Sequence, residues 1–164
     1  MATEIHVRGL AELNKYLQTL PIRIEKNVLR GSLRAGAKPI LAQAVAMVPV
    51  LSSELKKSLK IGTRARGGTV TATVKTNVFY ARFVEFGTQG HFINAKPGGF
   101  LSFGGIFAKS VWHPGIPKGP KAFMRPALDS QAQTAVIAAA VYMRNRLATK
   151  HGMDTAHIML DGDE

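Results

Sequence analysis

The leucines between positions 10 and 20 fall three or four residues apart. This spacing predicts a short amphipathic helix over residues 10–20, ended by Pro21. A longer helical pattern follows from Ile22 to Val48, with apolar residues near one face and basic residues among the rest. Pro39 has no amide hydrogen, so it should kink or divide this helix, and the alanines around it would let another backbone approach closely.

Polar and apolar residues alternate in the middle of the chain. Between residues 69 and 78, valines and an alanine alternate with threonines and Lys75, which is the pattern of a half-buried strand. β-branched residues near Leu59 to Ile61 predict a partner strand. Gly67 and Gly68 suit a hairpin turn between the two, with a basic and mobile tip. A third strand is predicted over residues 80–86, which completes a small antiparallel sheet.

Residues 87–120 are rich in glycine and proline, yet they also contain Phe92, Phe100, Phe103, Phe107 and Trp112. This composition is too glycine-rich for a helix and too aromatic for an ordinary disordered linker. We interpret it as a long functional loop that orders, at least partly, against a neighbour, because aromatic side chains are frequent interface anchors. The alternative, that the aromatic residues hold the loop against its own domain, remains equally open.

A last helix is expected from Ala127 to Lys150, with an acid near its start and basic residues near its end, as the helix dipole favours. Phe123, just before it, is expected in the core. The sequence therefore predicts an α+β fold: a small antiparallel sheet packed with a long kinked helix and a C-terminal helix. One domain should span residues 1–150, with the long loop at 87–120, and residues 151–164 should form an acidic tail.

The composition is that of a single domain with one buried core: 164 residues, of which 46% are hydrophobic. No apolar run approaches the roughly 18 residues of a membrane span. The first residues include Glu4 and Arg8 in place of a signal peptide's apolar run, so we expect a protein that is soluble and made in the cytoplasm, with no membrane partner. The chain has no cysteine, which excludes disulfides, thiolate metal sites and cysteine nucleophiles.

The formal charge is +12. Because four of the ten acids lie within residues 154–164, residues 1–153 carry six acids against all 22 lysines and arginines, a net charge of +16. Such a field favours DNA, anionic surfaces or an acidic partner protein. The candidates for contact with DNA or an acidic partner are Arg64 and Arg66 in the predicted hairpin and Arg30 and Arg34 on the long helix. A solvated basic face is the competing interpretation.

Little in the sequence suggests catalysis. The five histidines are scattered without the spacing of metal ligands. Between Lys26 and Leu128 the only carboxylates are Glu54 and Glu85, so a paired-acid hydrolase would be hard to assemble. The glycine pairs of residues 87–120 fit neither a P-loop nor a dinucleotide-binding motif. We therefore expect no enzyme activity, no catalytic residues, no metal and no cofactor.

Three segments, in order, carry a family resemblance. They are PVLSSELKKSL at residues 49–59, YARFVEFGT at 80–88 and PKAFMRPAL at 120–128. Together they resemble the pattern of a bacteriophage family of tail-component, tail-completion or head–tail joining proteins of long-tailed phages, over roughly residues 5–145. The second segment is the most specific. Two features depart from the pattern: Ser53 stands where the family has glycine, and the loop after residue 88 is longer.

The resemblance implies a structural virion protein that forms a ring of six subunits at the head-to-tail interface or the top of the tail, around the DNA passage. Its partners would be further copies of itself, neighbouring connector or stopper proteins, tail-terminator or tail-tube proteins, and DNA by non-specific contact. Glu85 would pair with a cation such as Arg82 or Arg125 within or between subunits. The interface candidates are Tyr80, Arg82, Glu85, Phe86, Phe92, Phe100, Phe103, Phe107, Trp112 and Arg125.

Three alternatives remain at this point. A free phage protein could bind DNA through charge alone, which steeply salt-dependent binding by the monomer would reveal. A small hydrolase would need a cleft with a perturbed pair of acids. Within the phage family, a tail-terminator or stopper role in the same neck is a close neighbour of the tail-completion role.

Overall fold

The computed structural model describes residues 8–49, 53–117 and 121–161. They divide into two compact units, which are considered separately: residues 78–122 form one, and the rest of the chain forms the other. Long helices and two-stranded antiparallel sheets make up the structure, so the predicted α+β class is confirmed.

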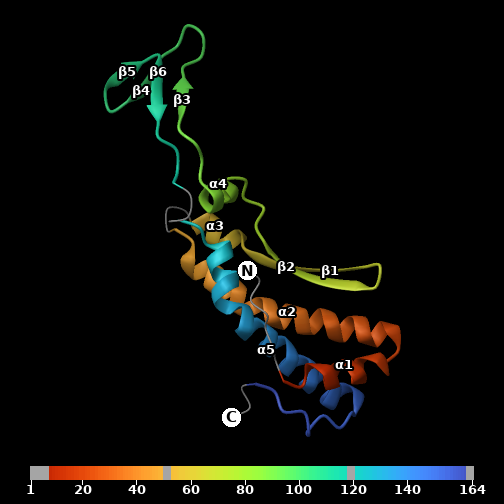
Figure 1. Cartoon of the computed structure of the whole chain (residues 1–164). Helices are drawn as coiled ribbons and strands as arrows, with labels where there is room; N and C mark the ends of the chain where they lie inside the picture. Colours follow the sequence, from red (N-terminus) through yellow and green to blue (C-terminus); the bar gives the residue numbers. More distant parts are fainter. Residues whose placement is uncertain (1–7, 50–52, 118–120, 162–164) are drawn as a thin grey trace. The chain divides into compact units, whose positions relative to one another are not determined.

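The larger unit is built on helices α1 (Leu10–Gln18), α2 (Ile22–Met47), α3 (Ser53–Ser58) and α5 (Met124–His151). Helices α2 and α5 lie side by side and make the most extensive contact in the chain (Figure 1). The predicted helices over residues 10–20, 22–48 and 127–150 are thus confirmed, with bounds shifted by a few residues. Phe123 precedes α5 and is fully buried, as expected.

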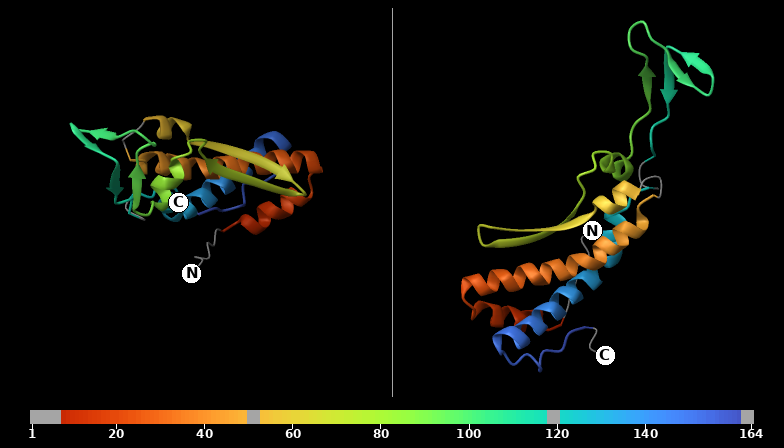
Figure 2. Two further views of the ribbon diagram at one scale, coloured as in Figure 1. Left: turned by 90° about the horizontal axis from the view of Figure 1, so that it is seen from above. Right: turned by 180° about the vertical axis from the view of Figure 1, so that it is seen from behind.

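Helix α2 runs through Pro39 without interruption. Figure 2 shows that its axis bends in the second half, so the proline does not divide the helix. Small residues let α5 come close: a Cβ on Gly36 would lie 2.6 Å from the Ala135 carbonyl oxygen and 3.1 Å from the Ala139 Cβ. The close backbone approach predicted for this stretch is therefore present, and its partner is α5.

Strands β1 (Lys60–Arg66) and β2 (Thr69–Lys75) form an antiparallel hairpin packed on α2. Gly67 and Gly68 both have positive φ, at 56° and 81°, as a two-residue type I′ turn requires. Alternate residues, including Val70 and Val74, are half-buried. The predicted hairpin is confirmed. The prediction that Arg64 and Arg66 form the tip of the hairpin is wrong. Both arginines lie within β1 and pair with residues of β2.

Residues 152–161 form an extended strap along α1 and α5. The charge pattern assigns this region to an acidic tail, yet Ile158 and Leu160 are buried in the main core with leucines of α1 and α5. The Arg144 guanidinium donates to the Ile158 carbonyl at 3.0 Å, and the Tyr16 hydroxyl donates to the Asp154 carbonyl at 2.9 Å. The strap is therefore part of the folded core; residues 162–164 lie outside the described residues.

The smaller unit contains helix α4 (Ala81–Phe86) and strands β3 (His91–Asn94), β4 (Leu101–Phe103), β5 (Ile106–Ala108) and β6 (Ser110–His113). The third strand predicted over residues 80–86 is wrong, because this segment is α4. Ala81 and Glu85, four residues apart, are both buried, so one helical face is covered. Gly87 ends the helix with φ 73°.

Candidate assembly interfaces

Strands β3 to β6 form a structure that we call the arm, residues 91–113 (Figure 2). β3 pairs with β6, and β4 pairs with β5 in a smaller hairpin beyond them. At its base, Thr88 and Ile116 exchange two backbone hydrogen bonds of 2.9 and 3.1 Å. Gly115 fits there because it has positive φ and because a Cβ would collide with the Thr88 carbonyl oxygen. The arm therefore consists of paired strands, whereas the sequence predicted a long loop.

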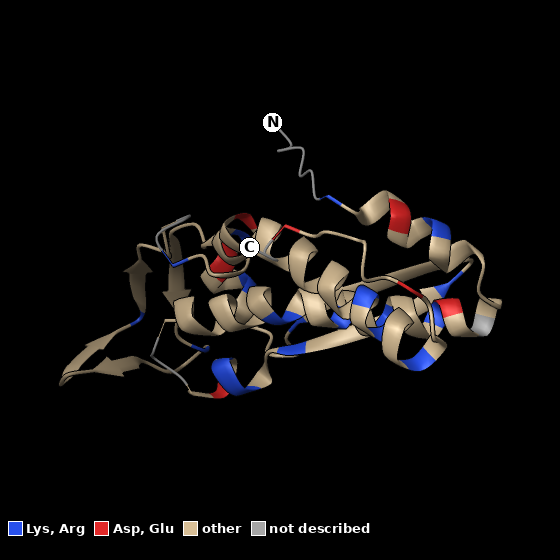
Figure 3. Ribbon diagram, turned by 90° about the horizontal axis from the view of Figure 1, so that it is seen from below, with Lys and Arg blue, Asp and Glu red and all other residues tan. Residues whose placement is uncertain are grey.

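The arm exposes its large apolar side chains. None of residues 91–113 is buried. Phe92 and Trp112 pair across β3 and β6, with ring centroids 4.9 Å apart, and remain 63% and 55% exposed. The other large apolar side chains that are exposed on the arm are Ile93, Phe100, Phe103, Ile106 and Phe107. No lysine, arginine, aspartate or glutamate lies in its four strands, whose ribbon is tan in Figure 3. The two lysines of the arm, Lys96 and Lys109, lie in the segments that connect the strands. Such a predominantly apolar surface is typical of an interaction site.

Four of the predicted interface residues lie at or on α4. Tyr80 is the N-cap residue and is half-buried. The Arg82 guanidinium lies 4.8 Å from the centroid of the Phe83 ring, in a cation–π arrangement. Phe86 is 53% exposed, whereas Glu85 is only 8% exposed. Phe86 and Arg82 are therefore accessible to a partner, and Glu85 is the least accessible of the four.

The remaining predicted residues lie in the larger unit. Arg125 lies in the first turn of α5 and is exposed, in the larger unit. Arg30 and Arg34 are exposed on α2. Arg64 and Arg66 are exposed on the hairpin. The predicted residues therefore come from both units, on α2, β1, α4, α5 and the arm.

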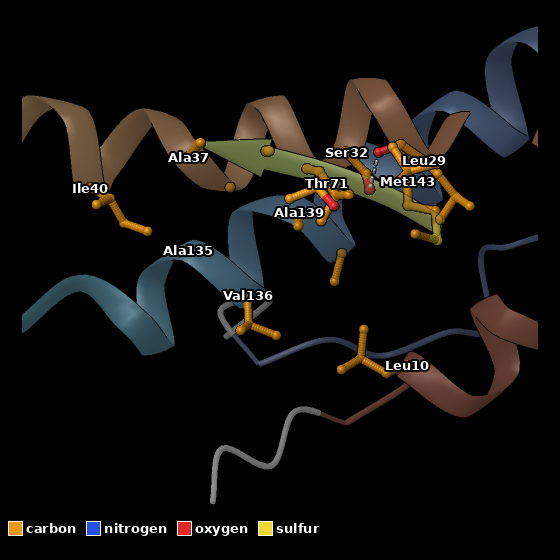
Figure 4. A pocket seen from close by; sticks show the side chains of 15 residues that line it. Leu10, Leu29, Ser32, Ala37, Ile40, Thr71, Ala135, Val136, Ala139 and Met143 are labelled. Atoms are coloured by element: carbon orange, nitrogen blue, oxygen red, sulfur yellow. Dashed lines mark hydrogen bonds between the residues drawn. The ribbon is translucent and has the colours of Figure 1, made fainter. Parts of the chain in front are cut away.

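The larger unit also has an apolar groove, which sequence reasoning missed. It has a volume of about 500 Å³ and lies among α2, α5 and β2, with Leu10 of α1 at one side (Figure 4). No charged residue lines it. Its only hydroxyl groups belong to Ser32, which donates to the Leu29 carbonyl at 3.3 Å, and Thr71. The aliphatic lining residues that stay half-exposed are Leu10, Leu29, Leu33, Ile40, Val70 and Val136.

A sequence signal for this groove existed, because these aliphatic residues continue the apolar faces of the predicted helices and strand. The sequence pattern does not show, however, whether another element covers an apolar face or leaves it open.

Among the residues that the structure describes, no three histidines, cysteines or carboxylates gather where they could hold a metal ion. In the same part of the chain, no helix combines the length and apolar character needed to cross a bilayer.

The comparisons with known proteins identify a family over part of the chain. Residues 11–87 match the family model described as "Bacteriophage HK97-gp10, putative tail-component". The matched segment begins in α1 and ends at Gly87, so it includes the YARFVEF stretch but neither the arm nor α5. No curated protein and no solved structure matches the chain. Over residues 11–87, the chain is therefore similar to the HK97-gp10-like family of bacteriophage tail components.

Proposed function

We propose that this protein is a ring-forming subunit of the phage neck, at the head-to-tail interface or the top of the tail, around the DNA passage. In this proposal the ring has six subunits and lies between connector or stopper proteins and the tail terminator or tail tube. The role is structural, and no catalytic step is assigned to the chain.

The observation that carries the proposal is the arm. None of the 23 residues of the arm is buried, and seven of its large apolar side chains are exposed. These are Phe92, Ile93, Phe100, Phe103, Ile106, Phe107 and Trp112. Leaving such a surface in water is unfavourable, by about 25 cal/mol for each Å² that a partner could cover. A subunit whose arm is covered by a neighbour would gain this energy on assembly.

The neighbour that fits best is another copy of the same chain. Copies with a net charge of +12 repel one another, so their close association is opposed least at surfaces with few cations. The strands of the arm have no charged residue, and neither does the lining of the groove. Both surfaces are also strongly apolar.

A closed ring needs two different surfaces on each subunit, because each copy meets the next head to tail. The arm and the groove can serve as these two surfaces. In the proposal, the arm of one copy packs in the groove of the next copy, and the groove's half-exposed aliphatic side chains receive aromatic ones.

The experiment is complementation of a phage that lacks this gene, followed by electron microscopy of the particles. The variant Phe100→Ser/Phe107→Ser removes two arm rings that are 62% and 70% exposed, so it should not change the stability of the isolated subunit. The matched control is Ile22→Ser, which changes a residue that is 67% exposed on α2, outside both surfaces.

We expect the wild-type gene and Ile22→Ser to restore joined, infectious particles. The arm variant should leave filled heads and tails that fail to join, or tails with abnormal ends. Normal infectious particles from the phage that lacks the gene would refute the neck role. Normal particles from the arm variant would refute the role of the arm.

A further inference from the structure

One face of the β1–β2 hairpin carries only cations, threonines and one glycine. The residues that alternate with the half-buried ones form cross-strand pairs along this face: Lys60 with Lys75, Gly62 with Thr73, Arg64 with Thr71, and Arg66 with Thr69. We call this set the basic face. None of its eight residues is acidic or carries an apolar side chain. The chain has no acidic residue anywhere between Glu54 and Glu85.

The four cations of the basic face are regularly spaced. Residues two apart on a strand lie about 6.6 Å apart, which separates Arg64 from Arg66. A Cβ on Gly62 would lie 3.2 Å from the Lys75 Cε and 3.5 Å from its Nζ, so the lysine side chain extends over the glycine. Its ammonium group thereby fills the gap between Lys60 and Arg64. The result is a row of positive charge along the ribbon.

We propose that the basic face binds the phosphates of double-stranded DNA without reading its sequence. Lysine and arginine neutralise phosphates, and threonine hydroxyls such as those of Thr69 and Thr73 can donate hydrogen bonds to phosphate oxygens. The inference rests on the proposed ring, because only a ring around the DNA passage would bring the basic face close to DNA. It assigns that contact to the hairpin rather than to Arg30 and Arg34 on α2.

An acidic protein fits this face less well than DNA does. The buried centre of a protein–protein interface is usually apolar and poor in lysine. The basic face has no apolar side chain and two lysines, Lys60 and Lys75. Protein–DNA interfaces are more polar and much more positively charged, as this face is. A polyanion in the passage would also offset the mutual repulsion of the basic subunits.

The test is DNA binding by the purified full-length chain, measured by fluorescence anisotropy with a labelled duplex of arbitrary sequence between about 50 and about 200 mM salt. The variant Lys60→Gln/Arg64→Gln/Arg66→Gln/Lys75→Gln removes the four cations of the basic face. The matched control is Lys15→Gln/Lys38→Gln/Arg146→Gln/Lys150→Gln, which removes four exposed cations elsewhere. The two variants have the same net charge.

Each phosphate contact contributes about 0.9 to the slope of log affinity against log salt, so four contacts contribute about 3.6. We expect the basic-face variant to lose a slope of about this size, whereas the control variant keeps it. Across the same salt range, four contacts account for a change in affinity of roughly 150-fold. Competing polyglutamate should displace the duplex poorly.

Three results would overturn the inference. The wild-type chain could fail to bind the duplex, both variants could lose affinity equally, or polyglutamate could displace DNA at equal charge concentration, as expected for an acidic protein partner. Sedimentation of the same variants separates this inference from the proposed ring. If the basic-face variant still assembles while wild-type protein ignores DNA, only the DNA contact is refuted.

Discussion

Gly36 determines how closely α2 and α5 can approach. A Cβ at this position would meet backbone, the Ala135 carbonyl oxygen at 2.6 Å. At Gly31, five residues earlier on α2, a Cβ would lie 2.4 Å from Tyr142, but the atoms it meets are at the far end of a side chain that is 37% exposed. The two glycines therefore differ in what must move when a methyl group is added.

We expect Gly36→Ala to lower the free energy of unfolding by up to about 2 kcal/mol. The methyl group forces the helices apart, at a cost of about 1–3 kcal/mol for overpacking, and the better helix propensity of alanine returns only about 1 kcal/mol. Gly31→Ala should be close to neutral, because the Tyr142 ring can rotate away. Urea denaturation of both variants measures the difference, and equal stabilities would contradict this account of the contact.

At the scale of elements, the strap of residues 152–161 is the least expected part of the fold. Its backbone passes so close to the start of α1 that a Cβ on Gly9 would lie 2.9 Å from the Met159 carbonyl oxygen. Ile158 is fully buried, and its neighbour Met159 is 66% exposed. The alternation of inward and outward side chains is that of an extended segment packed on helices.

Ile158→Ala should therefore lower the free energy of unfolding by about 2–5 kcal/mol, the range for deleting a buried aliphatic side chain. Met159→Ala, in the same segment, should change it by less than about 0.5 kcal/mol. Thermal or urea unfolding of the two variants gives the comparison. A strap that does not contribute to the core would give two small and similar changes.

The sequence predicted the elements whose pattern of apolar residues extends over many residues or repeats regularly. The three main helices and the β1–β2 hairpin follow from apolar spacing, alternation and the glycine pair. It misassigned residues 80–86, because a short run of aromatic and aliphatic residues fits a strand or a helix. The four-residue spacing of Ala81 and Glu85 was the available signal. The strap was hidden because its acids, Asp154 and Asp161, dominate its composition.

The candidate surfaces were predicted in part. For the aromatic residues of 87–120, the sequence left two alternatives open: they anchor an interface, or they hold the loop against its own domain. In the structure their rings are largely exposed. Their arrangement on paired strands could not be predicted, because the pairs of β3 to β6 are only three or four residues long. Arg64 and Arg66 were identified without Lys60 and Lys75, which share their face only once the register of the hairpin is known.

At the scale of the whole molecule, polarity separates two kinds of surface. The strands of the arm and the lining of the groove are apolar and without charge, whereas the basic face is charged and without apolar side chains. This separation suits a subunit that binds its own copies through some surfaces and a polyanion through another. Six copies would have a mass of about six times 17.7 kDa, near 106 kDa, and would concentrate positive charge around the passage.

The most direct test of the assembly account uses Trp112, which is the only tryptophan in the chain, lies on the arm and is 55% exposed. Its emission and its quenching by iodide should be followed while sedimentation reports the size of the purified protein at rising concentration. The account predicts that one closed oligomer forms as the emission shifts to shorter wavelength and quenching falls, and that Phe100→Ser/Phe107→Ser prevents both changes. A chain that stays monomeric, or an oligomer whose Trp112 remains as easily quenched as in the monomer, would contradict it.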